Sequence, residues 1–339
     1  MNTQTPSIER STRASQAGLV LALVVLLAAI LAPWWAERSS QRLLTEILYT
    51  LALAQMWNLL AGYGGLLSVG QQGFIGLGGY CLVVLGLQFG LNPFLIVPLA
   101  GVVTALVAIP TAAVLFRLRG AYFAVGTWVV AEVFRLVVAN TASVGGGSGT
   151  SITRTVTGIP VWWRESTTLW LAIALGGGAT LAVYWLLRSR HGLALTAVRD
   201  SEPAAESLGV SVVRMKWFVY IAAAAGSGMV GALIFITKLR IAPEAAFSMD
   251  WTAAMFFVVI IGGIGTIEGP IIGTLIYFVL RQFLSDYGSW YMIVLGCVAV
   301  AFMLWIPRGV WGLMSSRFDL HFFPVQRRVR LASTQEKQS

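Results

Sequence analysis

The chain has 339 residues, of which 57% are hydrophobic and only 11% are charged, and its mean hydropathy is +0.79. A soluble globular domain carries about 25% charged residues because its surface must meet water, so this composition excludes an ordinary soluble domain and indicates an integral membrane protein. The net charge of +9 does not indicate a nucleic-acid partner, because most Lys and Arg lie in short loops and in the tail after Trp305. Basic residues in those positions fix topology and contact anionic lipid.

Ten apolar segments each predict a helix that spans the bilayer, since a helix satisfies its own backbone hydrogen bonds in lipid. They lie near residues 18–35, 44–61, 72–88, 93–116, 120–139, 168–188, 214–237, 251–265, 270–285 and 289–306. The first resembles a signal peptide, but it is longer than an ordinary signal segment and lacks a small-x-small cleavage site, so we interpret it as an uncleaved span. The predicted fold class is all-α, a polytopic membrane helix bundle of about ten transmembrane helices with Gly-rich broken segments.

The basic residues predict that both termini lie in the cytoplasm, an N-in/C-in topology. This orientation puts most of the 23 Lys and Arg residues on the cytoplasmic side, in the regions around Arg10 and Arg13, in the loops 117–119 and 188–216, and in the C-terminal tail. Tryptophans then fall at span ends, as an aromatic belt requires. On the outer side these are Trp34, Trp35, Trp162, Trp163, Trp170 and Trp290. We divide the chain into an N-terminal cytoplasmic tail (1–17), one transmembrane domain (18–306) with a cytoplasmic loop at 189–213, and a basic cytoplasmic tail (307–339).

A Gly-rich segment with polar residues runs from Gly62 to Tyr80, between two apolar spans. Its candidate residues are Gly65, Ser68, Gly70, Gln71 and Gln72. Broken helices at membrane depth are tolerated where they are buried in protein or line a wet cavity, and transporters use such breaks at their binding sites. We therefore favour a break that lines a pathway, while close helix packing through small residues is the alternative.

Glu132 and Arg135 lie within the fifth apolar segment, three residues apart and so on one helix face. Charge inside a membrane is costly and raises a functional hypothesis by default. Contact with a transported substrate is one interpretation of this pair. A structural ion pair, with Arg135 extending toward the outer end of the helix, is the other.

The loop from Arg188 to Lys216 contains a capped helix by its sequence. Ser201 is a helix-capping residue, an acid and a proline follow it, and Gly209 suits the C-terminal end. The pattern predicts a short cytoplasmic helix that can seat in a groove on a partner. A solvated connector would not need these caps.

A second Gly-rich break joins the eighth and ninth apolar segments, and with the first it hints at an internal repeat around a shared pathway. Its candidate residues are Gly262, Gly263, Gly265, Glu268, Gly269 and Pro270. Glu268 is either an ordinary loop acid or a group that caps or gates the inner mouth.

Several of these patterns together resemble one known family. The run Glu202-Pro203-Ala204-Ala205-Glu206-Ser207-Leu208-Gly209 is similar to the Glu-x-Ala-Ala loop of ABC importer permeases, although the Ile-x-Leu-Pro of that loop does not follow. It occurs with Leu118-Arg119-Gly120-Ala121-Tyr122-Phe123-Ala124, with Gly62-Tyr63-x-Gly65-x-x-Ser68-x-Gly70 and with Gly262-Gly263-x-Gly265-x-x-x-Gly269-Pro270-x-x-Gly273. Together they resemble the branched-chain (hydrophobic) amino-acid permease family of ABC importers, and its M-type subunit more than its H-type, over roughly residues 45–315.

The resemblance implies a non-enzymatic permease subunit of the bacterial inner membrane that works by alternating access. Its implied partners are a homologous H-type permease subunit, two cytoplasmic ATPase subunits and a periplasmic solute-binding protein. ATP and Mg would be bound by the ATPase subunits, and no cofactor is expected in this chain, which lacks a Gly-x-x-x-x-Gly-Lys-Ser/Thr motif. Glu202, Ala204, Ala205 and Gly209 would couple the chain to the ATPase.

Other cargo and other mechanisms stay open at this point. Urea, short-chain amides or another small organic solute are alternative substrates, and no residue excludes them. An ion-coupled secondary transporter would need acidic residues at mid-membrane, where only Glu132 comes near. A membrane enzyme would need clustered His, Asp or Glu, which the sequence does not contain.

Overall fold

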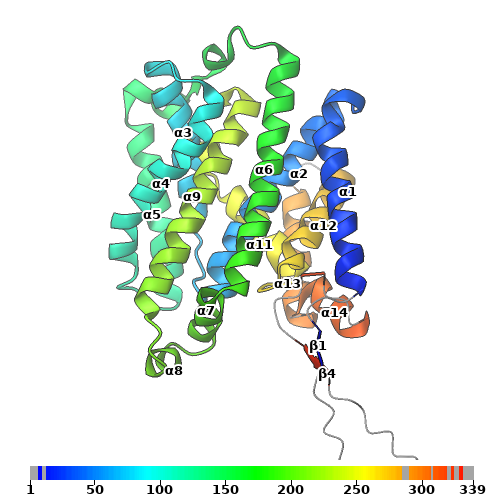
Figure 1. The fold of residues 1–339 in the computed structure, drawn as a ribbon. Helices are drawn as coiled ribbons and strands as arrows, with labels where there is room; N and C mark the ends of the chain where they lie inside the picture. The colour runs from blue at the N-terminus through cyan, green and yellow to red at the C-terminus, as the bar shows by residue number, and fades with distance from the viewer. Residues whose placement is uncertain are drawn as a thin grey trace, which may run out of the picture.

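The computed structural model describes residues 7–9, 13–284, 290–306, 308–318, 322–323 and 328–330, and long helices that run side by side form most of it (Figure 1). The α-helices are α1 (Arg13–Trp35), α2 (Arg38–Asn58), α3 (Gln71–Cys81), α4 (Pro93–Leu115), α5 (Ala121–Ala139), α6 (Val161–Arg188), α7 (Arg190–Asp200), α8 (Glu202–Ser207), α9 (Val212–Lys238), α10 (Pro243–Ala246), α11 (Met249–Gly262), α12 (Glu268–Leu284), α13 (Trp290–Trp305) and α14 (Gly309–Phe318). Two π-helical segments, η1 (Leu59–Tyr63) and η2 (Leu82–Gln88), continue α2 and α3, and three 3-10 turns follow α5 at η3 (Ala142–Val144), η4 (Gly146–Ser148) and η5 (Thr153–Val156).

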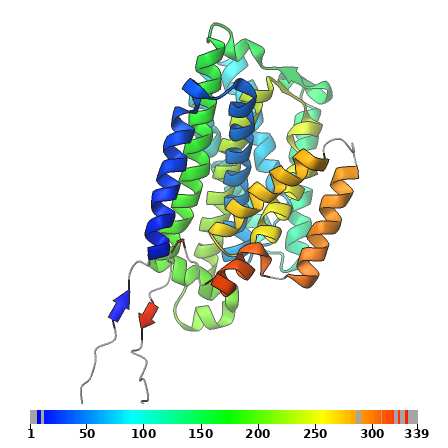
Figure 2. The same ribbon diagram turned by 90° about the vertical axis from the view of Figure 1, so that its right-hand side faces the viewer.

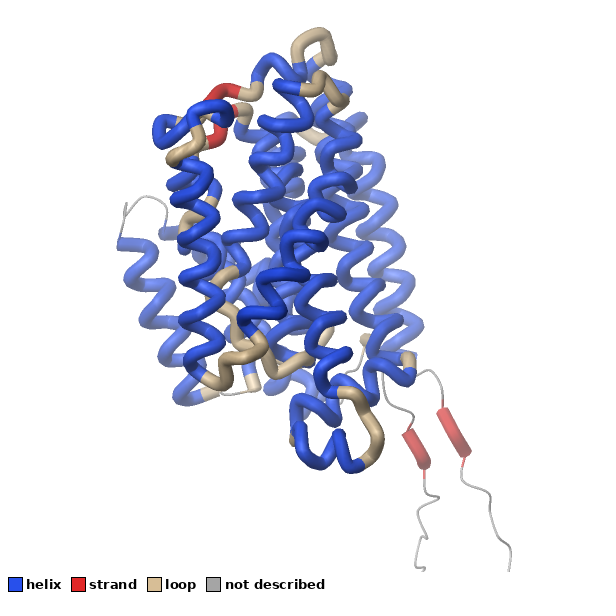
Figure 3. Tube along the Cα trace, turned by 90° about the vertical axis from the view of Figure 1, so that its left-hand side faces the viewer, coloured by secondary structure: helices blue, strands red, loops and turns tan. Residues whose placement is uncertain are grey.

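The described strands form two short antiparallel pairs at opposite ends of the bundle (Figure 3). Strand β1 (Ser7–Glu9) pairs with β4 (Arg328–Arg330), with Ile8 opposite Val329, at the end where α7, α8 and α14 also lie. Strand β2 (Thr150–Ser151) pairs with β3 (Arg240–Ile241) at the other end. We call the two ends of the molecule the α8 end and the β2–β3 end.

Seven described helices are long and apolar enough to cross a membrane. They are Arg38–Tyr63, Pro93–Leu115, Ala121–Ala139, Val161–Arg188, Val212–Lys238, Pro243–Gly262 and Gly296–Arg317. Every one of the ten predicted apolar segments contains a helix, but α1, α3 and α12 are not among these seven. The count of ten spans and the N-in/C-in topology therefore stay predictions. Most of the predicted tails, and residues 285 and 289 of the last two segments, lie outside the described residues.

Two helices begin about two turns before the apolar segments that predicted them. The predicted segments start at residues 44 and 168, whereas α2 starts at Arg38 and α6 at Val161. Charged residues lower the hydropathy of both N-terminal extensions, so the apolar pattern does not include them. Arg and Glu are nevertheless good helix-forming residues. The extensions lie against each other, since Arg42 of α2 donates to Glu165 of α6. A contact between distant residues thus accompanies the longer helices, which hydropathy alone does not predict.

Helix α9 lies at the centre of the bundle and packs against α3, α4, α2 and α6. Small residues allow the closest crossing, because a Cβ at Gly78 of α3 would overlap the carbonyl oxygen of Gly228 in α9. Membrane helices use such small residues to bring their backbones together. Beside this core, α12 packs against α11 and crosses the bundle at a tilt (Figure 2). The arrangement brings the two Gly-rich breaks close to α7.

Candidate functional site

The two predicted breaks are present as interruptions of helical structure. The first follows the π-helical turn η1, where the chain leaves the helix at Gly64, and helical structure resumes at Gln71. The second lies between the end of α11 at Gly262 and the start of α12 at Glu268. Gly65 and Gly263 have φ values of +67° and +128°, which side chains rarely adopt, so glycine is needed there.

Two amide side chains of α2 join one break to the other. Asn58 Oδ1 accepts a hydrogen bond from the Gly265 N–H at 2.8 Å, and its Nδ2 donates to the Thr266 carbonyl at 2.8 Å. Gln55 Nε2 donates to the Ile267 carbonyl at 2.9 Å. Both amides are fully buried. Because backbone groups freed from a helix need partners when they are buried, these two residues satisfy the second break from within the bundle.

Arg199, the penultimate residue of α7, lies where the two breaks meet. Its Nη1 donates to the Gly62 carbonyl at 3.2 Å, and its Nη2 lies 2.9 Å from Asp200 Oδ1. A Cβ added at Gly265 would lie 3.3 Å from Arg199 Nη1, and one at Gly65 would lie 3.6 Å from its Cα. We call this set, Asn58, Gly62, Gly65, Arg199 and Gly265, the break junction. It connects the 189–213 loop directly to both breaks.

The 189–213 loop contains two helices, α7 and α8, where the sequence predicted one. The predicted cap is present, because Ser201 Oγ accepts from the Ala204 N–H at 3.4 Å. Ala205 is buried against Val198 and Val212, which seats α8 on α7 and on the start of α9.

The other predicted coupling residues lie on the outside of that loop. Glu202, Ala204 and Gly209 are exposed, and Glu202 pairs with Lys216 at 2.6 Å. Gly209 has a φ of +80°, as its predicted position at a helix end requires. Leu208 beside it is 79% exposed, so α8 offers an uncovered apolar side chain at the tip of the molecule.

The polar residues of the first break, Ser68, Gln71 and Gln72, are fully buried. Gln71 Oε1 accepts from Ser227 of α9 at 3.1 Å, and Gln72 Oε1 accepts from Thr252 of α11 at 2.5 Å. Gln71 Nε2 is buried with no hydrogen-bond partner among the described residues. These contacts tie the start of α3 to two other helices and leave one donor unused. A pathway role for the three residues stays a prediction.

Ser68 and Gly70 turn the chain into α3. The Ser68 carbonyl accepts from the Trp57 indole at 2.9 Å, and Ser68 Oγ accepts from the Gly70 N–H at 3.3 Å. A Cβ at Gly70 would overlap the Thr127 carbonyl of α5. Close packing, the alternative to a pathway break, is thus present at this position.

Glu132 and Arg135 form the predicted ion pair on α5. Arg135 Nε donates to both carboxylate oxygens at 2.9 Å, and Nη2 reaches Oε1 at 2.5 Å. Their side chains are 38% and 27% exposed, on a helix whose surface is otherwise largely apolar and exposed. Contact of this pair with a substrate stays a prediction.

Glu268 begins α12 in the second break and is 9% exposed. Its Oε1 accepts from the Phe323 N–H at 2.9 Å, and the Phe323 ring lies 5.5 Å from that of Tyr184 in α6. Close packing of glycines completes this region, since a Cβ at Gly262 would overlap the Gly269 carbonyl, next to Pro270. Glu268 therefore holds a C-terminal residue against the α8 end.

Sequence reasoning missed the residues that connect these parts. Gln55 and Asn58 were visible as two amides on one face of an apolar helix, a signal for buried polar contacts. Arg199 carried no such signal, because its partner Gly62 contributes only a backbone oxygen. Among the described residues, no group of three or more His, Cys, Asp or Glu could hold a metal ion.

Comparison with known proteins identifies the family. Residues 39–303 match the family described as "Branched-chain amino acid transport system / permease component". The chain belongs to this family. It is 28% identical over 330 residues to the "High-affinity branched-chain amino acid transport system permease protein LivM" of Salmonella typhimurium, and 27% identical over 332 residues to the protein of the same name in Escherichia coli. Each alignment covers 90% of this chain and 77% of the relative.

A third relative comes from Methanocaldococcus jannaschii, the "Probable branched-chain amino acid transport permease protein LivM", at 23% identity over 264 residues, which covers 68% of this chain and 76% of the relative. No solved structure matches the chain. The resemblance to the M-type permeases is thus confirmed. With its seven membrane-capable helices, the chain is a multi-pass membrane protein of this transport permease family.

Proposed function

We propose that this chain is the M-type permease subunit of an ATP-driven ABC importer in the bacterial inner membrane. It would translocate branched-chain or related hydrophobic amino acids by alternating access, together with an H-type permease subunit, two ATPase subunits and a periplasmic solute-binding protein. The chain itself would carry out no covalent chemistry. The substrate class follows the names of the relatives, which each describe branched-chain amino acid transport.

The observation that carries the mechanism is the contact of Arg199 with the Gly62 carbonyl. In the proposed orientation the α8 end faces the cytoplasm, so an ATPase subunit would contact the exposed side of α8 around Glu202, Ala204 and Gly209. Ala205 joins α8 to α7, and Arg199 lies in the last turn of α7. Displacement of α8 by the ATPase would therefore move Arg199 against the carbonyl of Gly62.

The break junction is suited to change shape when it is pushed. Its connections are single hydrogen bonds from side-chain amides and a guanidinium to backbone groups, and these can exchange more cheaply than packed side chains can be displaced. The π-helical turn η1 is closed by a hydrogen bond across five residues, from the Gly64 N–H to the Leu59 carbonyl, and such turns occur often at functional positions. We infer that the junction is the hinge through which ATPase closure reaches the two breaks.

Gln71 has a role in this scheme as a candidate substrate contact. Its unused Nε2 donor is buried at the start of α3, directly after the first break. A buried amide donor without a partner costs free energy. A change of the break that brings this donor to a pathway would let it bind a substrate carboxylate, which supports the pathway prediction for Ser68, Gln71 and Gln72.

Co-purification and uptake test the function as a whole. The chain is co-expressed with a second permease, ATPases and a binding protein from the same source, and the purified assembly is reconstituted in vesicles. We expect an assembly of these subunits and ATP-dependent uptake of leucine, isoleucine or valine. Uptake of urea or a short-chain amide, without uptake of these amino acids, would show that the proposed substrate class is wrong. Uptake driven by an ion gradient without any ATPase would contradict the proposal.

A further inference from the structure

A cavity of about 300 Å³ opens at the β2–β3 end between the ends of α2, α6 and α9. Its charged lining consists of Arg42, Glu46, Arg164, Glu165 and Lys238. In the proposed orientation this end faces outward. Positive charge at the outer ends of spans departs from the positive-inside trend, so the group of cations calls for a partner of opposite charge.

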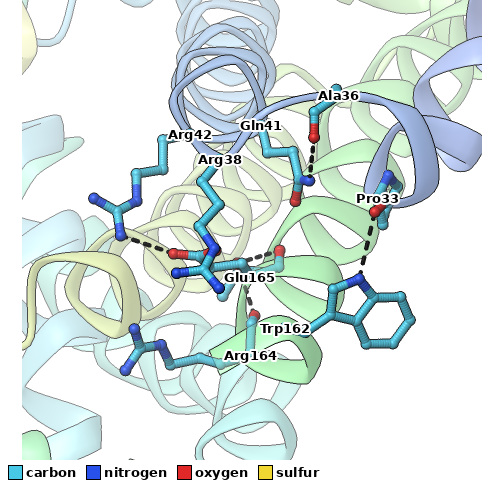
Figure 4. A network of polar contacts seen from close by, with 9 residues as sticks. Pro33, Ala36, Arg38, Gln41, Arg42, Trp162, Arg164 and Glu165 are labelled. Carbon is cyan, nitrogen blue, oxygen red and sulfur yellow. Dashed lines mark hydrogen bonds and ion pairs between the residues drawn. The ribbon is translucent and has the colours of Figure 1, made fainter. Parts of the chain in front are cut away.

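The carboxylates of the cavity do not neutralise its cations. Glu165 is 9% exposed and accepts from Arg42 Nη2 at 2.7 Å, and Arg38 Nε lies 3.7 Å from its other oxygen (Figure 4). Glu165 therefore serves two guanidinium groups at once. Glu46 is paired with Arg281 of α12 at 3.0 Å.

Two further cations, Arg164 and Lys238, take no part in the salt bridges of the described residues. Among the described residues, neither Arg164 nor Lys238 has a carboxylate within salt-bridge distance, and Lys238 Nζ lies 4.7 Å from the ring of Trp251. The cavity is left with an excess of positive charge. Arg42 and Arg38 supply the positive charge that the buried Glu165 carboxylate needs to stay ionised.

A cluster of tryptophans marks the level of this cavity in the membrane. The rings of Trp34 and Trp162 lie 6.0 Å apart, and the Trp162 indole N–H donates to the Pro33 carbonyl at 3.4 Å. Trp162 and Arg164 leave opposite sides of α6 in the same turn (Figure 4). Tryptophan rings prefer the depth of the lipid headgroups, so in the proposed orientation we place Arg164 at the depth of the phosphates.

We propose that this cavity binds the phosphate group of an anionic phospholipid of the outer leaflet. Arg164 and Lys238 are its principal ligands, with Arg42 beside them. Arginine suits this task because its planar guanidinium donates two parallel hydrogen bonds to a phosphate, and basic pockets between membrane helices bind anionic headgroups. The assignment rests on the orientation in the proposed function.

A lipid suits the cavity better than an acidic side chain of a docking protein. The cavity adjoins the α1–α2 turn, which lies lower than the loop before α6 (Figure 1). A large protein resting on the outer face would meet that higher loop first. Helix α1 beside it exposes Val24 and Leu27 at 58% and 61%, as a helix in contact with acyl chains does.

Native mass spectrometry of the purified full chain, with whatever subunits accompany it, tests the proposal. The protein is titrated with phosphatidylglycerol, with phosphatidylcholine and with inorganic phosphate. We expect phosphatidylglycerol to bind most tightly, and the double variant Arg164→Gln/Lys238→Gln to weaken it at least about tenfold, because two charge-assisted contacts are lost. The control Arg154→Gln/Arg240→Gln removes two exposed charges of the same end outside the cavity, and it should bind like the unmodified chain.

Further variants and comparisons distinguish lipid binding from protein docking and from a folding defect. The charge-conserving variant Arg164→Lys/Lys238→Arg should retain phosphatidylglycerol, which a variant that failed to fold would not do. Equal binding of phosphatidylglycerol and phosphatidylcholine, or unchanged binding in the Gln variant, overturns the proposal. So does a Gln variant that keeps the lipid but loses the solute-binding protein, which would assign the cavity to protein docking. Lipid binding is measured without transport, so failure of the importer assignment is seen separately.

Discussion

The two ends of the molecule differ in the polar contacts that join their helices. At the α8 end, the break junction uses neutral amides and one guanidinium that bind backbone carbonyl and N–H groups. At the β2–β3 end, the helix termini are joined by charged pairs, Arg42 with Glu165 and Arg281 with Glu46. Hydrogen bonds from a side chain to backbone groups can be exchanged at small cost, whereas loss of its arginine partners would leave the buried Glu165 carboxylate without a charged partner. From this difference we expect the α8 end to move more readily than the β2–β3 end.

The largest effect is expected where the second break packs most closely. In Gly262→Val the new side chain overlaps the Gly269 carbonyl, so the break cannot close around it. Overpacking of this kind costs about 1–3 kcal/mol or more, and we expect a lower melting temperature and loss of uptake. Gly177→Val in α6 is the control, because a Cβ there meets nothing within 4 Å. A Gly262→Val protein with normal melting and uptake would show that the break is loosely packed.

The second-largest effect is expected when the Asn58 side-chain amide, which joins the two breaks, is removed. Asn58→Ala leaves the Gly265 N–H and the Thr266 carbonyl without their partner, at a cost of about 1–3 kcal/mol. Gln88→Ala is the control: it removes an exposed hydrogen bond at the other end, from the Gln88 side-chain amide to the Ser143 carbonyl. It should change the free energy of unfolding by less than about 0.5 kcal/mol. Thermal unfolding of both variants in detergent compares them. Equal losses would contradict the difference between a buried and an exposed amide.

At the β2–β3 end, Glu165→Gln should lower stability and raise anion binding together. The neutral amide loses the pairing with Arg42 and Arg38, which costs about 1 kcal/mol because both arginines are exposed and regain water. The cavity gains net positive charge, so phosphatidylglycerol should bind more tightly. Melting curves and lipid titration measure the two signs. Weaker lipid binding in a folded variant would mean that Glu165 itself shapes the site for the phosphate.

The smallest effect on stability is expected from Glu132→Gln. The pair with Arg135 is partly exposed, and such pairs contribute about 0.2–1 kcal/mol. Uptake decides its role: a clear loss of transport at near-normal stability would assign the pair to the pathway. Normal uptake would leave it as a structural pair.

The sequence predicted the features that depend on neighbours in the chain. Apolar runs located the helices, Ser201 located the start of α8, and glycines located both breaks, because each depends on a few consecutive residues. The early starts of α2 and α6 were missed, since Arg42 and Glu165 are 123 residues apart. The break junction was missed for the same reason, as Asn58 and Gly265 are 207 residues apart.

The same distinction, between features set by neighbouring residues and contacts between distant ones, applies to the residues of the candidate site. Ala204 and Gly209 were found from a local motif, and both lie on the exposed side of α8 or at its end. Gln71 was identified as polar in an apolar context, but its contact with Ser227 depends on how α3 meets α9. The sequence pattern does not predict such a contact, because the two residues are far apart in the chain.

The most direct test of the account is the ratio of ATP hydrolysed to leucine taken up in vesicles that contain Arg199→Ala. This variant loses a charge-assisted hydrogen bond to the Gly62 carbonyl, which contributes roughly 1.5–3 kcal/mol, enough for about a tenfold change. We predict that the ATPase subunits still assemble and hydrolyse ATP while uptake falls about tenfold, and that Arg190→Ala at the other end of α7 keeps the normal ratio. An unchanged ratio in a correctly assembled Arg199→Ala transporter would contradict the coupling of α8 to the breaks through Arg199.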